Sequence, residues 1–169
     1  TAVSFYRKLK SGNLSNLRTG NLVHQFNLRN NPFDYATFEE VILNEAYNIP
    51  FGFEPKFIID GGGNIGLTAC FFASKFPAAA IITIEPDTDN YNLLQLNCKA
   101  YANIQTLQCG IWKNDTHLKI ENTHAGNNAF TVIETKEAGA DTIKALTVLS
   151  VMEQFNMPHI DVLKLDIEG

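Results

Sequence analysis

Hydrophobic residues in this chain gather in short runs that end abruptly in polar or glycine-rich segments. The first run, residues 57–59, leads into Asp60 and then into residues 61–66, four of which are glycine. A run without polar alternation is typical of a central parallel strand that is covered on both faces. Glycines directly after such a strand let the backbone turn tightly and approach a ligand. The pattern therefore predicts a strand that ends in a ligand-binding loop.

The residues after this loop predict a buried helix. From Leu67 to Phe76 the chain is apolar nearly all round, and Pro77 ends the segment. A strand, a glycine-rich loop and a helix in this order form one half of a nucleotide-binding unit, as in a doubly wound α/β fold with a mostly parallel sheet.

A second hydrophobic run, residues 81–84, ends in Glu85, Pro86 and Asp87, and Glu85 follows Gly66 by 19 residues. A parallel strand beside the first would place Glu85 at its carboxyl end, where a carboxylate can accept hydrogen bonds from both hydroxyls of a ribose. Pro86 fixes the direction in which the chain leaves the strand. Asp87 and the residue after it are both suitable caps for a following helix.

The helix after this cap is expected to end near Asn103 and to be followed by a strand over residues 104–108. Its apolar residues predict a face toward the sheet, made of Leu93, Leu94, Leu96 and Ala100. Gly110 comes just after the strand, so we expect it to lie beside the base of a bound nucleoside.

Weaker patterns predict the remaining elements. Residues 38–46 fit a short amphipathic helix, which we expect to cover one face of the sheet rather than the ligand. Residues 118–132 alternate between polar and apolar on both sides of a turn-rich centre, which predicts an antiparallel hairpin. His124 in that turn could act as a general base over the site, but a solvated loop histidine is the simpler interpretation. A strand over residues 143–148 and a short helix over residues 150–155 complete the set.

The last segment, residues 161–169, has the pattern of a core strand but carries charges. Side chains alternate along a strand, so Lys164, Asp166 and Glu168 share one side if the extended conformation continues. In a doubly wound sheet the strand after the reversal of strand order lies beside the first strand, which places these groups next to the glycine loop. We interpret these three charged residues as functional. The alternative is that Lys164 and one of the acids form an ion pair whose charges only neutralise each other.

Composition narrows the classes of function. The 169 residues, 45% of them hydrophobic, suffice for one domain with a substantial core. The formal net charge is −5 without any run of Lys or Arg, which argues against nucleic acid as a partner. Three widely spaced cysteines favour free thiols in a reducing compartment. With no signal peptide and no apolar span of about 18 residues, we expect a soluble cytoplasmic protein that does not bind membranes.

Two cofactors suit the glycine loop to different degrees. Gly61, Gly63 and Gly66 match the GxGxxG spacing of dinucleotide-binding loops, so an NAD-dependent oxidoreductase is one interpretation. Asp60 argues against it, because a fixed carboxylate beside the loop would repel a pyrophosphate. S-adenosylmethionine carries an ammonium and a sulfonium and no phosphate, so it suits the site better. A third interpretation is a nucleoside-binding module without catalysis.

Three motifs together resemble the FkbM-type methyltransferases: Ile-Ile-Asp-Gly-Gly-Gly-Asn-Ile-Gly at residues 58–66, Ile-Glu-Pro-Asp at residues 84–87, and Asp-Val-Leu-Lys-Leu-Asp-Ile-Glu-Gly at residues 161–169. The resemblance implies a Rossmann-like class I methyltransferase fold, S-adenosylmethionine as methyl donor, and a hydroxyl acceptor on a sugar or other small-molecule scaffold. It divides the chain into an N-terminal segment with a short helix, residues 1–50, and an incomplete S-adenosylmethionine-binding domain, residues 51–169.

The motifs suggest residues for each part of the site. Cofactor-binding residues are expected in the loop, at the end of the second strand and after the third: Asp60, Gly61, Gly62, Gly63, Asn64, Gly66, Glu85, Pro86 and Gly110. Lys164, Asp166 and Glu168 are expected to form the acceptor end, with an acid as the base and the lysine orienting the acceptor oxygen. The two acids could instead hold a divalent metal, but no third protein ligand can be identified, so we favour a site without metal.

The chain departs from the FkbM pattern in two respects. The family usually has alanine where Gly63 stands, and its sheet continues for several strands beyond the last motif. Residues 162–165 would form an open sheet edge if the protein ended at Gly169, and open edges invite association. We therefore expect further strands after Gly169. The oligomeric state and the identity of the acceptor are left open.

Overall fold

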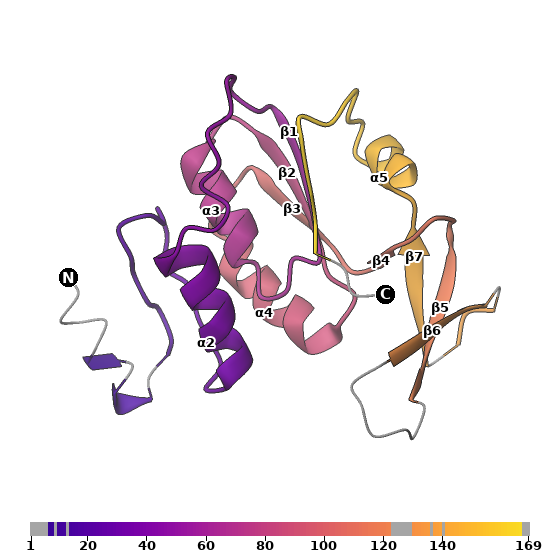
Figure 1. The fold of residues 1–169 in the computed structure, drawn as a ribbon, viewed down its shortest axis with the longest axis horizontal. Coiled ribbons are helices and arrows are strands. Elements are labelled where there is room, and N and C mark those ends of the chain that lie inside the picture. The colour runs from indigo at the N-terminus through magenta and orange to yellow at the C-terminus, as the bar shows by residue number, and fades with distance from the viewer. Residues whose placement is uncertain are drawn as a thin grey trace.

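The computed structural model describes residues 7–8, 10–12, 14–122, 130–135, 137–139 and 141–166. In chain order its elements are α2 (Pro32–Phe38), the π-helical turn η1 (Glu39–Leu43), β1 (Phe57–Gly61), α3 (Leu67–Lys75), β2 (Ala80–Ile84), α4 (Thr88–Cys98), β3 (Ile104–Leu107), β4 (Gly110–Ile111), β5 (Thr116–Asn122), β6 (Phe130–Thr135), β7 (Thr142–Leu146), α5 (Val148–Gln154) and β8 (Val162–Leu165). Figure 1 shows helices on both sides of a central sheet, which confirms the predicted α/β class.

The central sheet has four parallel strands in the order β3-β2-β1-β8. The chain moves outward from β1 to β3 and later returns to the other side of β1, so the strand order reverses between β1 and β8. Ligands of doubly wound sheets bind at such a reversal, at the carboxyl ends of the strands. Asp60 of β1 is in register with Thr83 of β2 and with Lys164 of β8. The predicted position of the last strand beside the first is confirmed.

The two faces of this sheet have separate cores. On one face, Ile58 and Ile81 pack with the apolar residues of α3, α4 and the N-terminal segment. On the other face, Ile59 and Ile82 pack with Val151 of α5 and its neighbours. Figure 1 shows α2, α3 and α4 on one side of the sheet and α5 on the other. Residues 67–73 of α3 are all buried, as predicted for a helix that is apolar nearly all round.

The N-terminal segment contributes to the first of these cores. Its buried residues there are Leu14, Leu17, Leu22, Phe26, Leu28, Phe38, Val41 and Ile42. The helix predicted over residues 38–46 was placed wrongly at both ends. Asn31 caps α2 through the N–H of Asp34 and Pro32 occupies its first turn, so the helix begins earlier. Glu45 has a φ of +49°, which no helix can continue, so Ala46 lies outside.

Helix α4 begins as predicted, because the Asp87 carboxylate accepts the N–H of Asn90 at 2.8 Å. Its buried face was predicted only in part: Leu94 is buried and Leu93 is partly buried against the same core, as expected. The buried residues are Leu94, Asn97 and Cys98, at spacings of three and four. Leu96 and Ala100 are exposed, and the helix ends at Cys98 rather than near Asn103. The buried face therefore includes an asparagine, Asn97, which the leucine pattern did not predict.

A second sheet, in the order β4-β7-β5-β6, lies beside α5. Strands β5 and β6 form the predicted antiparallel hairpin, and β7 and α5 begin one or two residues before their predicted positions. His124, in the turn of the hairpin, lies outside the described residues. The three cysteines are free, as expected, and all three are buried. Within the described part of the chain, no helix is long and apolar enough to cross a membrane.

Asp161 ties the beginning of β8 to the beginning of β1. Its Oδ2 accepts the N–H groups of Lys56 at 2.7 Å and Phe57 at 3.0 Å, and its Oδ1 lies 3.2 Å from His159 Nε2. These contacts favour the ionised carboxylate, so the pKa of Asp161 is lowered, with the hydrogen bond from Lys56 as the largest cause. The strand that carries the last motif is thus held in register from the residue just before it.

We expect Asp161→Asn to remove an acid-dependent part of the stability. An acid whose pKa is lower in the folded than in the unfolded state stabilises the fold above its unfolded pKa, and that contribution disappears as the pH falls through the folded pKa. Urea unfolding midpoints measured from about pH 7 to about pH 2 should therefore fall less steeply for Asp161→Asn than for the wild type. Asp161→Ala also removes the acceptor and should be less stable at neutral pH than Asp161→Asn. Parallel curves for the wild type and Asp161→Asn would contradict this role.

Candidate functional site

The glycine loop between β1 and α3 folds back on the end of β2. The N–H groups of Gly62 and Gly63 both donate to the carbonyl oxygen of Ile84, at 3.0 and 2.8 Å. The N–H of Gly66 donates to the carbonyl oxygen of Gly63 at 2.8 Å, and Gly66 then caps α3 with a φ of +84°. The loop is therefore a tight turn in which these N–H groups are used by protein acceptors.

Two positions in the loop have no room for a side chain. Gly62 has a φ of +73°, and a Cβ there would collide with the backbone carbonyl of Asp166. A Cβ at Gly63 would collide with Thr83 Oγ1 and would lie 2.9 Å from Leu94 Cδ1. The alanine that FkbM-type sequences usually carry at position 63 does not fit here unless Thr83 moves.

Asp60 and Lys164 form an ion pair beneath the loop. The Asp60 side chain is fully buried; its Oδ2 accepts a hydrogen bond from Thr83 Oγ1 at 2.8 Å, and its Oδ1 lies 3.1 Å from Lys164 Nζ. Lys164 Nζ also donates to the carbonyl oxygens of Gly61 at 3.3 Å and Gly62 at 2.7 Å. Only 8% of the Lys164 side chain is exposed. The ammonium therefore neutralises the buried acid and fixes the loop at the same time.

Tyr47, from the N-terminal segment, lies over this ion pair. Its ring centroid is 5.7 Å from Lys164 Nζ, within the range of a cation–π contact. Burial raises the pKa of the Tyr47 hydroxyl to about 12, and the negative charges of Asp166, Glu40 and Asp60 act in the same direction. The Tyr47 hydroxyl thus stays protonated near three carboxylates.

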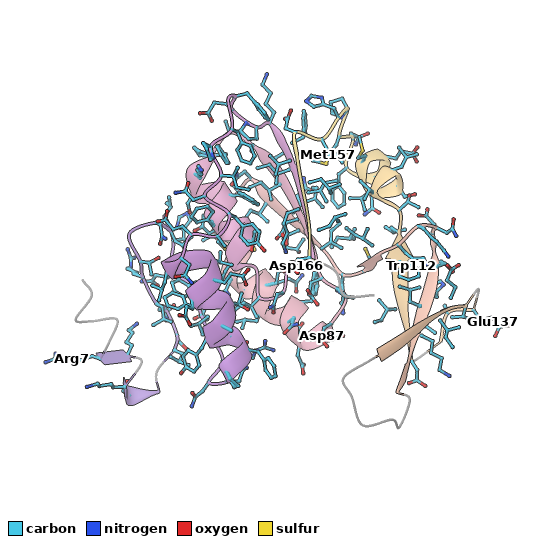
Figure 2. All side chains as sticks on the ribbon, viewed as in Figure 1. Arg7, Asp87, Trp112, Glu137, Met157 and Asp166 are labelled. Atoms are coloured by element: carbon cyan, nitrogen blue, oxygen red, sulfur yellow. The ribbon has the colours of Figure 1, made fainter. Side chains whose placement is uncertain are left out.

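Asp166 is the accessible member of the last motif. Its backbone N–H donates to the carbonyl oxygen of Gly61 at 3.0 Å, whereas 66% of its side chain is exposed and its Oδ2 is 3.8 Å from Lys164 Nζ. Figure 2 shows Asp166 at the same end of the sheet as Asp87, where the strands finish. Glu168 lies outside the described residues. Within those residues, no three or more His, Cys, Asp or Glu side chains are arranged to hold a metal ion.

Glu85 stands at the carboxyl end of β2, directly beside the loop. Only 6% of the residue is exposed. Its Oε2 accepts the N–H of Asn64 at 2.8 Å and its Oε1 accepts the N–H of Asp87 at 3.0 Å. Burial raises the pKa of Glu85, and the two backbone donors partly oppose that effect. Each oxygen keeps acceptor capacity for a ligand hydroxyl.

Of two further residues expected to bind the cofactor, Pro86 lies beside the loop and Gly110 lies in the second sheet. Pro86 is half-buried next to Glu85. Gly110 is buried in β4 of the second sheet, where a Cβ would contact Leu118 Cδ1 at 3.5 Å and Ala145 Cβ at 3.7 Å. Its neighbour Ile111 reaches the loop instead, since Ile111 Cδ1 lies 2.6 Å from where a Cβ on Gly61 would be.

Several residues that shape the site were not predicted. Thr83 had a detectable signal, because it is a polar residue inside the run 81–84 that we treated as continuously apolar. Tyr47 belongs to the Glu-Ala-Tyr stretch at residues 45–47, which also resembles the FkbM pattern, but no role was assigned to it. Thr37 had no signal, since it reaches the loop only through tertiary packing. Thr37 Oγ1 accepts a hydrogen bond from Asn64 Nδ2 at 3.1 Å.

Comparison with known proteins identifies several similar methyltransferases. Methyltransferase 1 of Beauveria bassiana is 26% identical over 156 residues, covering 78% of this chain and 61% of the relative. Methyltransferase sdnD of Sordaria araneosa is 32% identical over 44% of this chain and 30% of its own length. Hexuronic acid methyltransferase AglP of Haloferax volcanii is 27% identical, with coverages of 69% and 47%. The chain thus spans about three fifths or less of the length of these relatives.

A solved structure and a family model agree with this result. The crystal structure of methyltransferase FkbM from Methylobacillus flagellatus superposes with a TM-score of 0.52 at 17% identity, covering 82% of this chain and 33% of that one. At this identity the match shows the fold, which is the predicted Rossmann-like methyltransferase fold. The model of the methyltransferase FkbM domain matches residues 60–169, which include the glycine loop, Glu85 and the last motif. The chain belongs to the FkbM methyltransferase family.

Proposed function

We propose that this chain is the cofactor-binding part of an S-adenosylmethionine-dependent methyltransferase that methylates a hydroxyl group on a sugar or another small molecule. Membership of the FkbM family supports the reaction class. The relative whose name is hexuronic acid methyltransferase supports a sugar acid as one class of acceptor. The hydroxyl as acceptor group is inferred from the resemblance that the motifs carry, and the cofactor is inferred from the motifs together with the site geometry.

The choice of cofactor is supported by how the loop uses its N–H groups. Those of Gly62, Gly63, Asn64 and Gly66 all donate to protein acceptors, and the acceptor of Asn64 is the Glu85 carboxylate. Dinucleotide-binding loops instead direct free N–H groups at a pyrophosphate. A ligand without phosphate therefore fits this loop better than NAD does, although the glycine spacing alone matches both.

The chain's residues have distinct parts in this proposal. S-adenosylmethionine, when bound, supplies a methyl group on a positively charged sulfur. Glu85 accepts hydrogen bonds from the ribose hydroxyls, with Pro86 beside it, and the backbone of residues 61–66 contacts the methionine part. Asp60 acts from below the loop, because its carboxylate is fully buried against Lys164. Gly110 is still proposed beside the base from its position after β3, and its neighbour Ile111 is the residue of β4 that reaches the loop.

The acceptor end is proposed to lie at the end of β8. Asp166 is the candidate base, since its exposed carboxylate can take the proton of an acceptor hydroxyl as the new bond to carbon forms. Glu168 is proposed for the same role from its position in the motif. Lys164 donates to the carbonyl oxygens of Gly61 and Gly62 and lies near Asp166, so it is proposed to orient both the loop and the candidate base. An acceptor oxygen could contact its ammonium only beside these groups. We propose a site without metal.

We expect Glu85→Gln to weaken binding of S-adenosylhomocysteine by about ten- to a hundredfold, because a hydrogen bond to a charged group is worth roughly 1.5 to 3 kcal/mol. Isothermal titration calorimetry on the wild type and the variant tests this. Glu54→Gln, an exposed acid before β1 at the opposite end of the sheet, serves as the matched control. An unchanged dissociation constant for Glu85→Gln would remove Glu85 from the site, and binding of NAD in place of S-adenosylhomocysteine would favour an oxidoreductase.

The same titrations should depend on pH in a way that identifies Glu85. Because burial raises its pKa, Glu85 takes up a proton at a higher pH than an ordinary glutamate does on acidification. Affinity for S-adenosylhomocysteine should therefore begin to fall earlier on acidification than the usual glutamate pKa would suggest. Glu85→Gln should not show this fall. An identical pH profile for both proteins would show that another group is responsible.

We expect Asp166→Asn and Glu168→Gln to lower turnover while S-adenosylhomocysteine still binds. A general base typically contributes about a hundredfold or more to the rate, so the variant of the true base should lose at least that much. The assay uses the full-length enzyme with a panel of hydroxyl-bearing sugar acids, with and without chelator, and Asp89→Asn on the exposed start of α4 as control. Chelator sensitivity would favour a metal, and wild-type turnover in both variants would refute the assignment. Binding without turnover in the wild type on every acceptor would favour a non-catalytic module.

A further inference from the structure

The N-terminal segment precedes the residues matched by the family model, yet it reaches the glycine loop through α2. Thr37, in the last turn of α2, donates its hydroxyl proton to the carbonyl oxygen of Phe33 at 3.1 Å. A hydroxyl has one proton and two lone pairs, so the Thr37 oxygen is left as an acceptor. It accepts the Asn64 Nδ2 hydrogen bond at 3.1 Å. The direction of this contact is therefore fixed by the helix.

Asn64 connects this contact to Glu85. It has a φ of +49°, which is uncommon for a residue other than glycine, so its conformation depends on its surroundings. Its side chain is held by Thr37, and its backbone N–H donates to Glu85 Oε2 at 2.8 Å. A rotation of Asn64 would move both contacts together.

We propose that Thr37 is a positioning residue for the cofactor site. By holding the Asn64 side chain, it keeps the Asn64 N–H aimed at Glu85 and so keeps the Glu85 carboxylate in place for the ribose. This inference rests on the proposed function. It extends the site to a helix that lies before the family-matched residues 60–169 and that the sequence motifs do not mention.

The segment that carries Thr37 is anchored to the next loop residue as well. Asn97 of α4 is 1% exposed. Its Oδ1 accepts the N–H of Asn27 at 2.8 Å, and its Nδ2 donates to the carbonyl oxygen of Ile65 at 2.8 Å and to that of Asn27 at 3.1 Å. Two consecutive loop residues, Asn64 and Ile65, are thus connected to the N-terminal segment by side-chain hydrogen bonds.

A charged contact fixes the beginning of α2. Arg29 Nη2 lies 2.7 Å from Oδ1 of Asp34, which is 1% exposed, and also donates to Asn90 Oδ1 at 2.7 Å in the first turn of α4. The pKa of Arg29 is raised, chiefly by its hydrogen bond to Asp34. Helix α2 is therefore held against α4 at one end and against the loop at the other.

The test compares Thr37→Val with Thr37→Ser in the full-length protein. Valine has the shape, the β-branching and nearly the helix propensity of threonine but no hydroxyl, whereas serine keeps the hydroxyl. Titration with S-adenosylhomocysteine should show a dissociation constant about two- to tenfold higher for Thr37→Val and close to the wild-type value for Thr37→Ser. Urea unfolding midpoints of the three proteins should agree. If Thr37 were only structural, Thr37→Val would change the unfolding midpoint, and Thr37→Ser would not restore binding.

A double-mutant cycle with Asn64→Gly makes the inference independent of any loss of stability. Glycine keeps the positive φ at position 64 and removes the side chain that Thr37 holds. In the Asn64→Gly background, Thr37→Val should have no further effect on binding. An equal loss in both backgrounds, or no loss in the wild-type background, overturns the role of Thr37 and leaves the proposed function standing. Failure of the wild type to bind S-adenosylhomocysteine overturns the proposed function and this inference with it.

Discussion

The buried carboxylate of Asp60 is the constraint on which the rest of the site depends. A carboxylate that is removed from water is unfavourable unless it is paired and hydrogen-bonded. Thr83 on one neighbouring strand and Lys164 on the other supply those partners, and both are in register with Asp60. The strand order β2-β1-β8 therefore satisfies the buried charge of Asp60 as well as the packing of the hydrophobic runs. A different strand beside β1 would leave the acid without its cation.

The same ion pair sets the shape of the loop above it. Lys164 donates to the carbonyl oxygens of Gly61 and Gly62, and the end of β8 lies so close to Gly62 that no Cβ fits. The loop is thus held from below by β8, from behind by the Ile84 carbonyl and from the side by α2 through Thr37. A ligand would meet a surface that is already folded, which reduces the entropy lost on binding.

Much of this arrangement could be predicted from the sequence because its signals are local. The apolar runs before Asp60 and Glu85 gave the central strands, and strand alternation placed Lys164 beside the loop. Local signals fail where polar side chains are buried by partners that are distant in the sequence. Asn97 is buried because it bonds to Asn27 and Ile65, so the periodicity of the leucines found only part of the buried face of α4. Tyr47 and Thr37 likewise depend on tertiary contacts that no spacing encodes.

The close contact between Gly63 and Thr83 has a consequence for how such loops diverge among relatives. A methyl group at position 63 and a hydroxyl at position 83 compete for one volume. Since the Thr83 hydroxyl also donates to Asp60, replacing it by a smaller residue would free the volume but deprive the acid of a donor. The two positions should therefore vary as a linked pair, with glycine accompanying a hydroxyl and alanine accompanying a smaller or differently oriented partner. An exchange of glycine for alanine at position 63 therefore also changes which group can hydrogen-bond to the buried Asp60 carboxylate.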